Sequence, residues 1–323
     1  MSSSFSRREF IGGVLATGVV AAMSRSIFAA VNSPFHVSVI NDEISQDFGH
    51  VIEVVTKEFG LEWIELRGMW KKNIMDLDEK ELAEAKTLID RAKLRVTDIG
   101  SPVFKVDWPG APRSKFAPKR DTFNADFNFK QQDDLLEKSF ELAKRFDTDR
   151  VRIFDFWRLD DQTPYRKAMD DKLSEAADKA AKKNIILILE NEHECNTATG
   201  EEAGRTLSAV QAKNFMVNWD PGNAAMRGEI PFPDGYNKLP KDRIGHVHCK
   251  DVQKKANGSG MEWAAMGRGT IDWVGQFRAL KQQGYHYATS LETHWRGAGT
   301  PEESTRQSWA GMKDELQKAG ALS

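Results

Sequence analysis

The chain has 323 residues, with 46 lysines and arginines against 48 aspartates and glutamates, and a formal net charge of -2. This balance gives no reason to expect a nucleic-acid or membrane-surface partner, and it favours a small-molecule ligand. The length suits one large domain or two ordinary ones, and α/β barrels of this size often form a single domain.

The first 30 residues match an export signal. The run Ser6-Arg7-Arg8-Glu9-Phe10-Ile11 precedes an apolar segment that ends near Ala22, and small residues follow at Ala29 and Ala30. A membrane anchor is the alternative, but the segment falls short of the ~20 residues that a spanning helix needs, and glycines interrupt it. We therefore expect residues 1–30 to be a cleaved twin-arginine signal and the mature protein to be periplasmic, with no membrane contact.

The cysteine content is low, with only Cys195 and Cys249 in the whole chain. An oxidising compartment would allow a disulfide between them. A chain of this length can be stabilised by its core alone, so we expect two buried free thiols.

From residue 34 onward, short apolar runs alternate with helical patterns, and no Pro/Gly/Ser-rich linker divides residues 34–323. The runs predict eight strands: Phe35–Ile40, Leu61–Leu66, Arg95–Gly100, Asp149–Phe154, Ile185–Glu190, Phe215–Asp220, Ile244–Lys250 and Tyr287–Thr293. Apolar residues three and four apart predict helices over Leu77–Leu94, Phe129–Phe146, Lys167–Lys183, Gly200–Lys213, Ile271–Gln283 and Pro301–Ala319.

This alternation favours an α/β fold of one domain, a (β/α)8 TIM barrel, with its active site at the carboxyl ends of the strands. A doubly wound sheet is the alternative, but no G-x-G-x-x-G turn follows an early strand. Two connections, residues 101–128 and 222–243, are longer than a barrel needs. They are predicted either to cover the substrate or to decorate the surface.

Four of the later strands end in a side chain able to bind a metal: Glu190, Asp220, His248 and Glu292. Side chains alternate along a strand, so His246, His248 and Lys250 share one face, as do Ser290, Glu292 and His294. Carboxyl ends of barrel strands meet at one mouth, so we expect the four ligands to converge. Three carboxylates and one imidazole suit Mn²⁺, Mg²⁺ or Co²⁺, whereas a structural zinc site is typically rich in thiolates.

Each of these residues has a simpler explanation when taken alone. A single Glu after a strand is often a rim ion pair, Asp220 before Pro221-Gly222 is an ordinary turn residue, and an isolated His is usually a satisfied core residue. Their joint occurrence on strand ends favours the metal.

The ordered motifs resemble the sugar isomerase and epimerase superfamily with a xylose isomerase-like TIM barrel. They are LILENEH around Glu190, NWDPGNA around Asp220, GHVHCKD around His248 and SLETH around Glu292, with Asn41-Asp42-Glu43, Glu65-Leu66-Arg67 and the segment from Gly267 to Trp273. The resemblance covers nearly the whole mature chain. It implies one divalent ion, most often Mn²⁺ with Zn²⁺ among the alternatives, and two glutamates on opposite faces of a carbohydrate substrate.

The sequence departs from the epimerase pattern at two positions. Asn223 stands where a substrate-binding His is expected three residues after the metal Asp, and Lys254 stands where an Arg is expected six residues after the metal His. Endonuclease IV, a relative, needs additional histidines for its three-metal cluster, and most of them are absent here.

The expected reaction is proton abstraction next to a carbonyl of a keto sugar or sugar derivative, with Glu190 or Glu292 as general base. Reprotonation would make the protein an isomerase or epimerase. Loss of a β-substituent, as from a 3-oxo-glycoside or an inosose, would make it a lyase or dehydratase, and a sugar-binding barrel without catalysis is the third alternative. A homo-oligomer is left open. Candidates to bind the substrate are Arg67, Lys105, His193, Asn223, Lys250 and His294. For all of them except Asn223, an ion pair at the rim of the barrel is the alternative.

Overall fold

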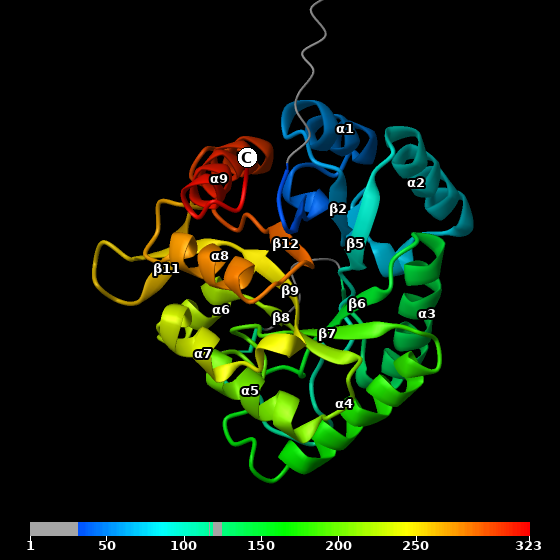
Figure 1. The fold of residues 1–323 in the computed structure, drawn as a ribbon. Helices are drawn as coiled ribbons and strands as arrows, with labels where there is room; N and C mark the ends of the chain where they lie inside the picture. The colour runs from blue at the N-terminus through cyan, green and yellow to red at the C-terminus, as the bar shows by residue number, and fades with distance from the viewer. Residues whose placement is uncertain (1–31, 116, 119–124) are drawn as a thin grey trace, which may run out of the picture.

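The computed structural model describes residues 32–115, 117–118 and 125–323, so the predicted export signal lies outside the described residues (Figure 1). Eight parallel strands form one sheet in the order β1-β12-β9-β8-β7-β6-β5-β2. A parallel pairing of Ile40 with Glu65 joins the two edges, so the predicted (β/α)8 barrel is confirmed. The strands are β1 (His36–Val39), β2 (Trp63–Leu66), β5 (Arg95–Ile99), β6 (Arg150–Ile153), β7 (Ile186–Glu190), β8 (Phe215–Trp219), β9 (Ile244–Cys249) and β12 (Ala288–Leu291).

Helices surround the strands on the outside of the barrel (Figure 1). Their spacing of apolar residues gives each long helix one buried stripe, as with Leu135, Leu136 and Phe140 of α3. A capping box formed by Asp78 and Glu81 begins α2, as its sequence allows. The helices are α1 (Phe48–Glu53), α2 (Glu79–Ala92), α3 (Gln132–Arg145), α4 (Arg166–Ala181), α5 (Gly200–Ala209), α6 (Pro221–Met226), α7 (Tyr236–Lys238), α8 (Trp273–Gln282) and α9 (Pro301–Lys318).

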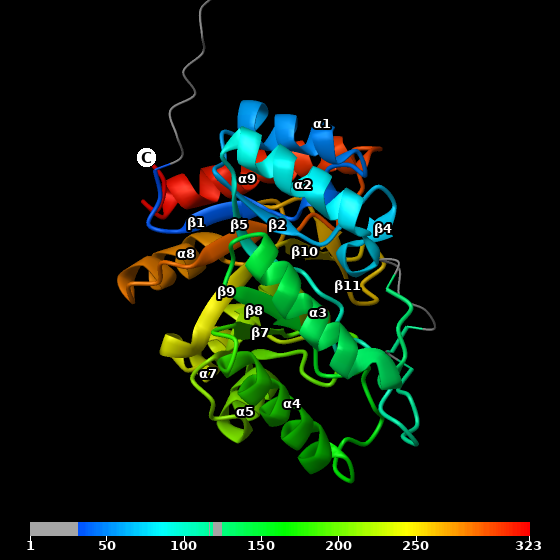
Figure 2. The same cartoon turned by 90° about the vertical axis from the view of Figure 1, so that its right-hand side faces the viewer.

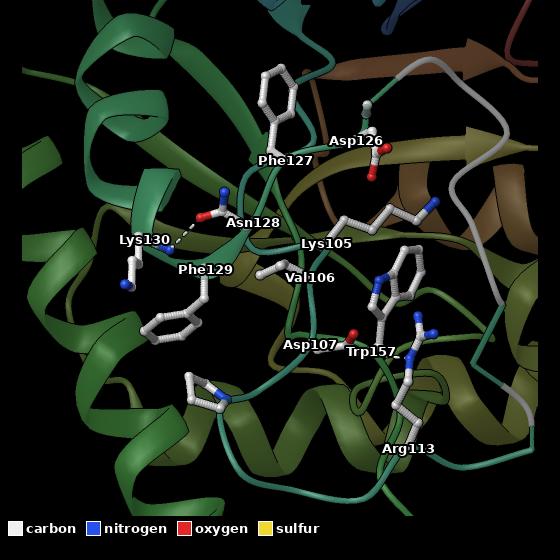
Figure 3. A pocket seen from close by; sticks show the side chains of 12 residues that line it. Lys105, Val106, Asp107, Arg113, Asp126, Phe127, Asn128, Phe129, Lys130 and Trp157 are labelled. Atoms are coloured by element: carbon white, nitrogen blue, oxygen red, sulfur yellow. Dashed lines mark hydrogen bonds and ion pairs between the residues drawn. The ribbon is translucent and has the colours of Figure 1, made fainter.

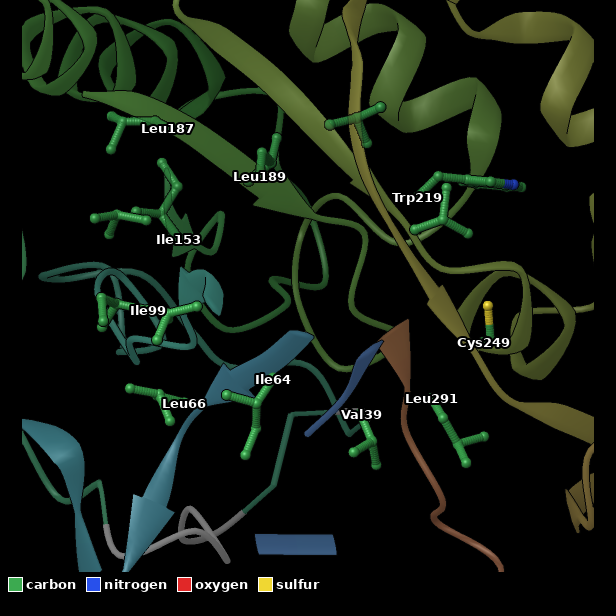
Figure 4. Close-up of a cluster of buried hydrophobic side chains, with 14 of the residues drawn as sticks. Val39, Ile64, Leu66, Ile99, Ile153, Leu187, Leu189, Trp219, Cys249 and Leu291 are labelled. Atoms are coloured by element: carbon green, nitrogen blue, oxygen red, sulfur yellow. The ribbon is translucent and has the colours of Figure 1, made fainter. Parts of the chain in front are cut away.

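The barrel wall is apolar outside and polar inside. Side chains such as Ile64, Ile153, Leu189 and Leu291 pack between strands and helices, and residues of this kind come from all eight strands (Figure 4). The alternate positions are polar yet buried: Ser38, Glu65, Asp98, Arg152, Glu190, Asn218, His246, His248 and Ser290. Alternation along each strand therefore gathers charged groups in the interior, where they must pair with one another or hold a ligand.

Several elements were not predicted from the sequence. Two small hairpins, β3 (Gly68–Met69) with β4 (Lys72–Asn73) and β10 (Asp251–Lys254) with β11 (Met261–Ala264), follow the carboxyl ends of β2 and β9. Figure 2 shows β4 and β11 at the same end of the barrel. The short helices α6 and α7 were also missed, because runs of three to six residues carry too little periodicity to recognise.

Cys195 and Cys249 are both buried and free, as predicted. Among the described residues, no helix combines the length and apolar character that crossing a membrane requires.

Candidate metal centre

The four predicted ligands lie at the carboxyl ends of neighbouring strands. Glu190 is the last residue of β7, and Glu292 directly follows β12. Asp220 follows β8 and accepts a hydrogen bond from the Asn223 backbone N–H at 2.8 Å, which starts α6. His248 lies in β9, between β8 and β12 in the sheet. Adjacent parallel strands thus bring residues from distant parts of the chain to one mouth.

One ligand atom from each of the four side chains lies within 4.8 Å of the others. His248 Nδ1 is 3.4 Å from Glu190 Oε1, 3.7 Å from Asp220 Oδ2 and 3.2 Å from Glu292 Oε2. All four residues are at most 2 % exposed. The geometry brings the predicted ligands together, and their role in binding a metal stays a prediction.

The atoms at this point fit a divalent cation. His248 Nδ1 is fully buried and has no hydrogen bond among the described residues, although three carboxylates face it. Burial alone would lower the pKa of His248, but the charges of Glu65, Glu190 and Glu292 raise the pKa well above its usual range. This buried cluster of negative charge attracts either a proton or a metal ion. Its oxygen-rich ligand set favours Mn²⁺, Mg²⁺ or a similar ion.

Permanent cations already approach the same carboxylates. Lys250 Nζ lies 2.8 Å from Asp220 Oδ2 and 2.6 Å from Glu292 Oε2, two of the three oxygens that face His248 Nδ1. Burial tends to lower the pKa of Lys250, but the same two carboxylates raise it above its usual range. Lys250 therefore stays charged, close enough to contact any oxygen bound at the centre.

Two arginines complete the charge pairing. Arg152 Nη1 lies 3.2 Å from Glu190 Oε2. Arg67 donates to Glu292 at 2.8 Å and also pairs with Asp42 and Glu43. Three carboxylates hold Arg67 in place. This arrangement fits the alternative of an ion pair at the rim better than it fits direct substrate binding.

Below the centre, a carboxylate lies against the other nitrogen of the predicted histidine ligand. His248 Nε2 is 3.2 Å from both oxygens of Glu65, whose Oε2 is also 3.3 Å from His246 Nε2. His246 Nδ1 in turn lies 3.5 Å from Asp98 Oδ1. Burial and the neighbouring Glu65 charge raise the pKa of Asp98 to about 6. A carboxylate behind a metal-binding histidine commonly fixes its tautomer and ring orientation.

The remaining predicted substrate residues form a polar path that leads away from the centre. Asn223 donates to Glu190 Oε1 at 3.1 Å, and the His193 ring contacts Asn223 at 2.9 Å. His193 also pairs with Glu192 at 2.6 Å, and Glu192 lies 3.4 Å from Lys105 Nζ. Lys105 is thus several contacts away from the four ligands, whereas Asn223 touches one of them.

Trp263 of β11 covers the same region from the hairpin side. Its ring lies edge-on to His193 and His294, with centroids 5.7 and 5.0 Å away, and Lys250 Nζ is 5.0 Å from its centroid. His294 Nε2 lies 3.2 Å from Glu292 Oε1. The hairpin therefore brings an aromatic ring to the residues beside the centre.

No functional role was predicted for Glu65, Arg152, Glu192 or Trp263. Glu65 carried a usable signal, because a charged residue in the middle of an otherwise apolar strand is unusual. Glu192 could have been noticed beside Glu190. Trp263 had no such signal, because its position depends on an unpredicted hairpin.

The fold and the side chains at its mouth define a (β/α)8 barrel with a buried cluster suited to a divalent metal. The model of the xylose isomerase-like TIM barrel family matches residues 55–315. The chain belongs to this family, as its motifs indicated. None of the curated proteins matches the chain.

Solved structures share the fold at low sequence identity. The D-psicose 3-epimerase of Clostridium cellulolyticum H10 is 16% identical, with 88% of this chain and 99% of that chain covered and a TM-score of 0.65. The probable 3-DHS dehydratase AsbF of Bacillus anthracis is 19% identical, with 86% and 98% covered and a TM-score of 0.63. The IOLI protein, solved with a zinc atom, is 18% identical, with 88% and 99% covered and a TM-score of 0.66.

Proposed function

We propose that this protein is a divalent-metal-dependent enzyme that removes a proton next to a carbonyl of a keto sugar or sugar derivative, and that it acts as an isomerase or epimerase. The observation that carries the proposal is the convergence of Glu190, Asp220, His248 and Glu292 within 4.8 Å at the barrel mouth. Family membership supports the same class of chemistry.

A divalent ion held by these four residues, most often Mn²⁺ in this family, would supply Lewis-acid stabilisation of a carbonyl and an adjacent hydroxyl oxygen. Glu190 and Glu292 are the two candidate proton acceptors at the centre. Burial raises the pKa of Glu292, but the charges of Lys250, His294 and His248 outweigh burial and hold it well below the usual range. Glu190 has the weaker set of partners, so we assign it the role of general base.

The surrounding side chains would orient the sugar. Lys250 is placed to stabilise negative charge on a substrate oxygen, because its ammonium lies beside two of the predicted ligands. His193, at the edge of the site, would bind a hydroxyl or return the proton. Its contact with Asn223 links it to Glu190.

The second candidate is a lyase or dehydratase. Asn223 and Lys254 depart from the pattern of the 3-epimerases. The fold is also shared by the probable dehydratase AsbF, with a TM-score of 0.63 against 0.65 for the epimerase. The first chemical step would be the same, with a leaving group expelled in place of reprotonation. A sugar-binding barrel without catalysis would show neither outcome.

Solvent deuterium distinguishes these candidates. The mature chain loaded with Mn²⁺ is incubated in D₂O with keto sugars and 3-oxo-glycosides, and products are followed by NMR and mass spectrometry. Deuterium in a C–H position of an otherwise intact sugar supports the isomerase, and a released substituent supports the lyase. We expect Glu190→Gln to abolish exchange while circular dichroism stays unchanged, with Glu201→Gln on the exposed start of α5 as control. Retained exchange in Glu190→Gln would reject the assigned base.

We also propose that the twin-arginine route exports the protein to the periplasm. The support is the Arg7-Arg8 pair and the apolar segment that follows it. Replacing both arginines with lysine should retain the precursor in the cytoplasmic fraction, whereas unchanged periplasmic recovery would reject this route.

A further inference from the structure

A pocket of about 850 Å³ lies beside the barrel mouth, between the connection that follows β5 and the segment that follows β6. Figure 3 shows Lys105 extending between Asp126 and the indole of Trp157, with Phe127 and Phe129 on the other side. The volume lies within the range of pockets that bury drug-sized ligands, which is more than a single sugar ring needs. None of the four predicted metal ligands lines this pocket.

The lining suits an uncharged ring. Trp157, Phe127 and Phe129 supply apolar aromatic surface, and Asn128 and Asp126 supply hydrogen-bonding groups at its border. Phe129 is fixed by edge-on packing with Trp108 at 5.4 Å. Aromatic walls combined with a few polar groups are typical of sites that hold ring-shaped ligands.

The pocket's charges do not favour a phosphate group. Arg113 Nε is paired with Asp107 at 2.5 Å, and Lys105 Nζ lies 3.4 Å from Glu192. Lys105 also lies over the rings of Phe154 and Trp157, at 4.7 and 5.3 Å from their centroids. A phosphate would have to compete with these carboxylates for Arg113 and Lys105, which leaves Lys130 as the remaining cation of the lining, whereas a neutral ligand leaves both ion pairs in place.

Lys105 connects the pocket to the candidate metal centre. The contacts from Lys105 to Glu192, from Glu192 to His193 and from His193 to Asn223 measure 3.4, 2.6 and 2.9 Å. Asn223 then contacts Glu190 at 3.1 Å. This chain of four contacts connects Lys105 at the pocket to Glu190 at the centre, so a substituent on a sugar bound at the centre would extend along this path to reach the pocket.

We infer that this pocket is a second subsite, which binds an uncharged ring attached to the reacting sugar, and that the substrate is a two-ring glycoside instead of a free monosaccharide. The inference rests on the proposed function, because it places the reacting sugar at the metal centre. Both an aryl aglycone and a second sugar have the required chemistry, namely a ring with an apolar face. Binding energy from such a remote ring can be used to position the reacting carbonyl.

The test compares three ketoses with the Mn²⁺-loaded full-length mature protein: 3-oxo-glucose, its phenyl β-glycoside, and cellobiose oxidised at C3 of its non-reducing ring. Deuterium exchange gives kcat and KM for each compound. We expect kcat/KM to be about tenfold or more higher for at least one two-ring compound than for 3-oxo-glucose, in line with the burial of one additional ring. The phenyl and cellobiose arms show which type of ring the pocket prefers.

Phe127→Ala removes one wall of the pocket at a partly exposed position, so the fold should be retained. We expect it to raise KM for the preferred two-ring compound about tenfold and to leave KM for 3-oxo-glucose within about twofold. Trp157→Phe, which keeps an apolar ring at this buried position, should change KM in the same direction by a smaller factor. Ile230→Ala, at an exposed apolar residue outside the pocket, is the control and should change neither value.

Exchange with 3-oxo-glucose but no preference for either two-ring compound would reject the subsite and leave the proposed function standing. Equal effects of Phe127→Ala on one-ring and two-ring compounds would also reject it. No exchange with any of the three compounds would reject the subsite. If the keto sugars also show no exchange, the proposed function is rejected with it.

Discussion

We predict that the buried Glu65 side chain orients His248, a proposed metal ligand, without contacting the ion itself. Both of its oxygens lie 3.2 Å from His248 Nε2, so the Nε2–H can donate to a charged acceptor while Nδ1 faces the other three ligands. His246 Nε2 lies 3.3 Å from Glu65 Oε2, and Asp98 lies against the other nitrogen of the His246 ring. A hydrogen bond from Nε2–H to Glu65 would select the tautomer whose Nδ1 is free to bind a metal.

We predict that Glu65→Gln weakens Mn²⁺ binding about 10–100-fold, because the uncharged amide is a poorer acceptor for the His248 N–H. Isothermal titration calorimetry measures the dissociation constant, and circular dichroism checks the fold. Glu62→Gln, at an exposed position just before the same strand, is the matched control. An unchanged dissociation constant in Glu65→Gln would contradict the assigned role.

The pair formed by His193 and Glu192 provides a prediction about pH. Burial lowers the pKa of His193, but the Glu192 carboxylate at 2.6 Å outweighs burial and raises it above the usual value. A raised folded-state pKa means that the pair stabilises the fold fully below the unfolded value of 6.5 and loses this contribution as pH rises through the folded value.

We therefore expect His193→Asn to lower the free energy of unfolding more at pH 6 than at pH 9, by roughly 0.5–1 kcal/mol, as for a partly exposed ion pair. Urea unfolding at the two pH values measures the difference. The same substitution in a Glu192→Gln background should lose the pH dependence. A larger effect at pH 9 would show the opposite sign and reject the explanation.

At the level of elements, α9 contacts the turn before Ile271 at a position that only glycine can occupy. A Cβ on Gly311 would lie 1.7 Å from the carbonyl oxygen of Met266, which is backbone and cannot move aside alone. Helix propensity by itself favours alanine over glycine by about 1 kcal/mol. The packing contact here opposes that preference, because it fixes how closely α9 approaches the segment that follows β11.

We predict that Gly311→Ala lowers the free energy of unfolding by about 1–3 kcal/mol, as overpacking does, despite the better helix propensity of alanine. Chemical denaturation measures the change. Ala310→Gly, on the exposed face of the same helix, should lower stability by about 1 kcal/mol through propensity alone. Stabilisation by Gly311→Ala would mean that the close approach does not exist in solution.

For the whole molecule, metal binding and folding stability should be coupled. The ligands come from strands that are distant in sequence, so the complete site exists only in the closed barrel. The ion should therefore bind the folded chain and not the unfolded one. It would also relieve the repulsion among the buried carboxylates of Glu190, Asp220 and Glu292.

We expect Mn²⁺ at 100 times its dissociation constant to raise the free energy of unfolding by about 2.7 kcal/mol, and a chelator to reverse the gain. Thermal and urea unfolding with and without the ion measure it. In Glu190→Gln the gain at the same ion concentration should be much smaller. Equal stabilisation of the two proteins would place the binding site elsewhere.

Much of the architecture could be predicted from sequence because strand and helix patterns are local. The eight apolar runs and the amphipathic helices between them were recognised from neighbouring residues alone. Alternation also placed Glu190, Asp220, His248 and Glu292 at strand ends. In a barrel of parallel strands, those ends must share one face.

Only the tertiary structure decided how the interior charges pair. Nothing local relates Glu65 to His248, which is 183 residues away, or places Lys250 between Asp220 and Glu292. The hairpin carrying Trp263 and the pocket around Trp157 likewise depend on how the connections fold over the barrel mouth. Periodicity in a sequence records which face of an element is buried. The partner across the barrel depends on closure and register, which are set by packing among residues far apart in the chain.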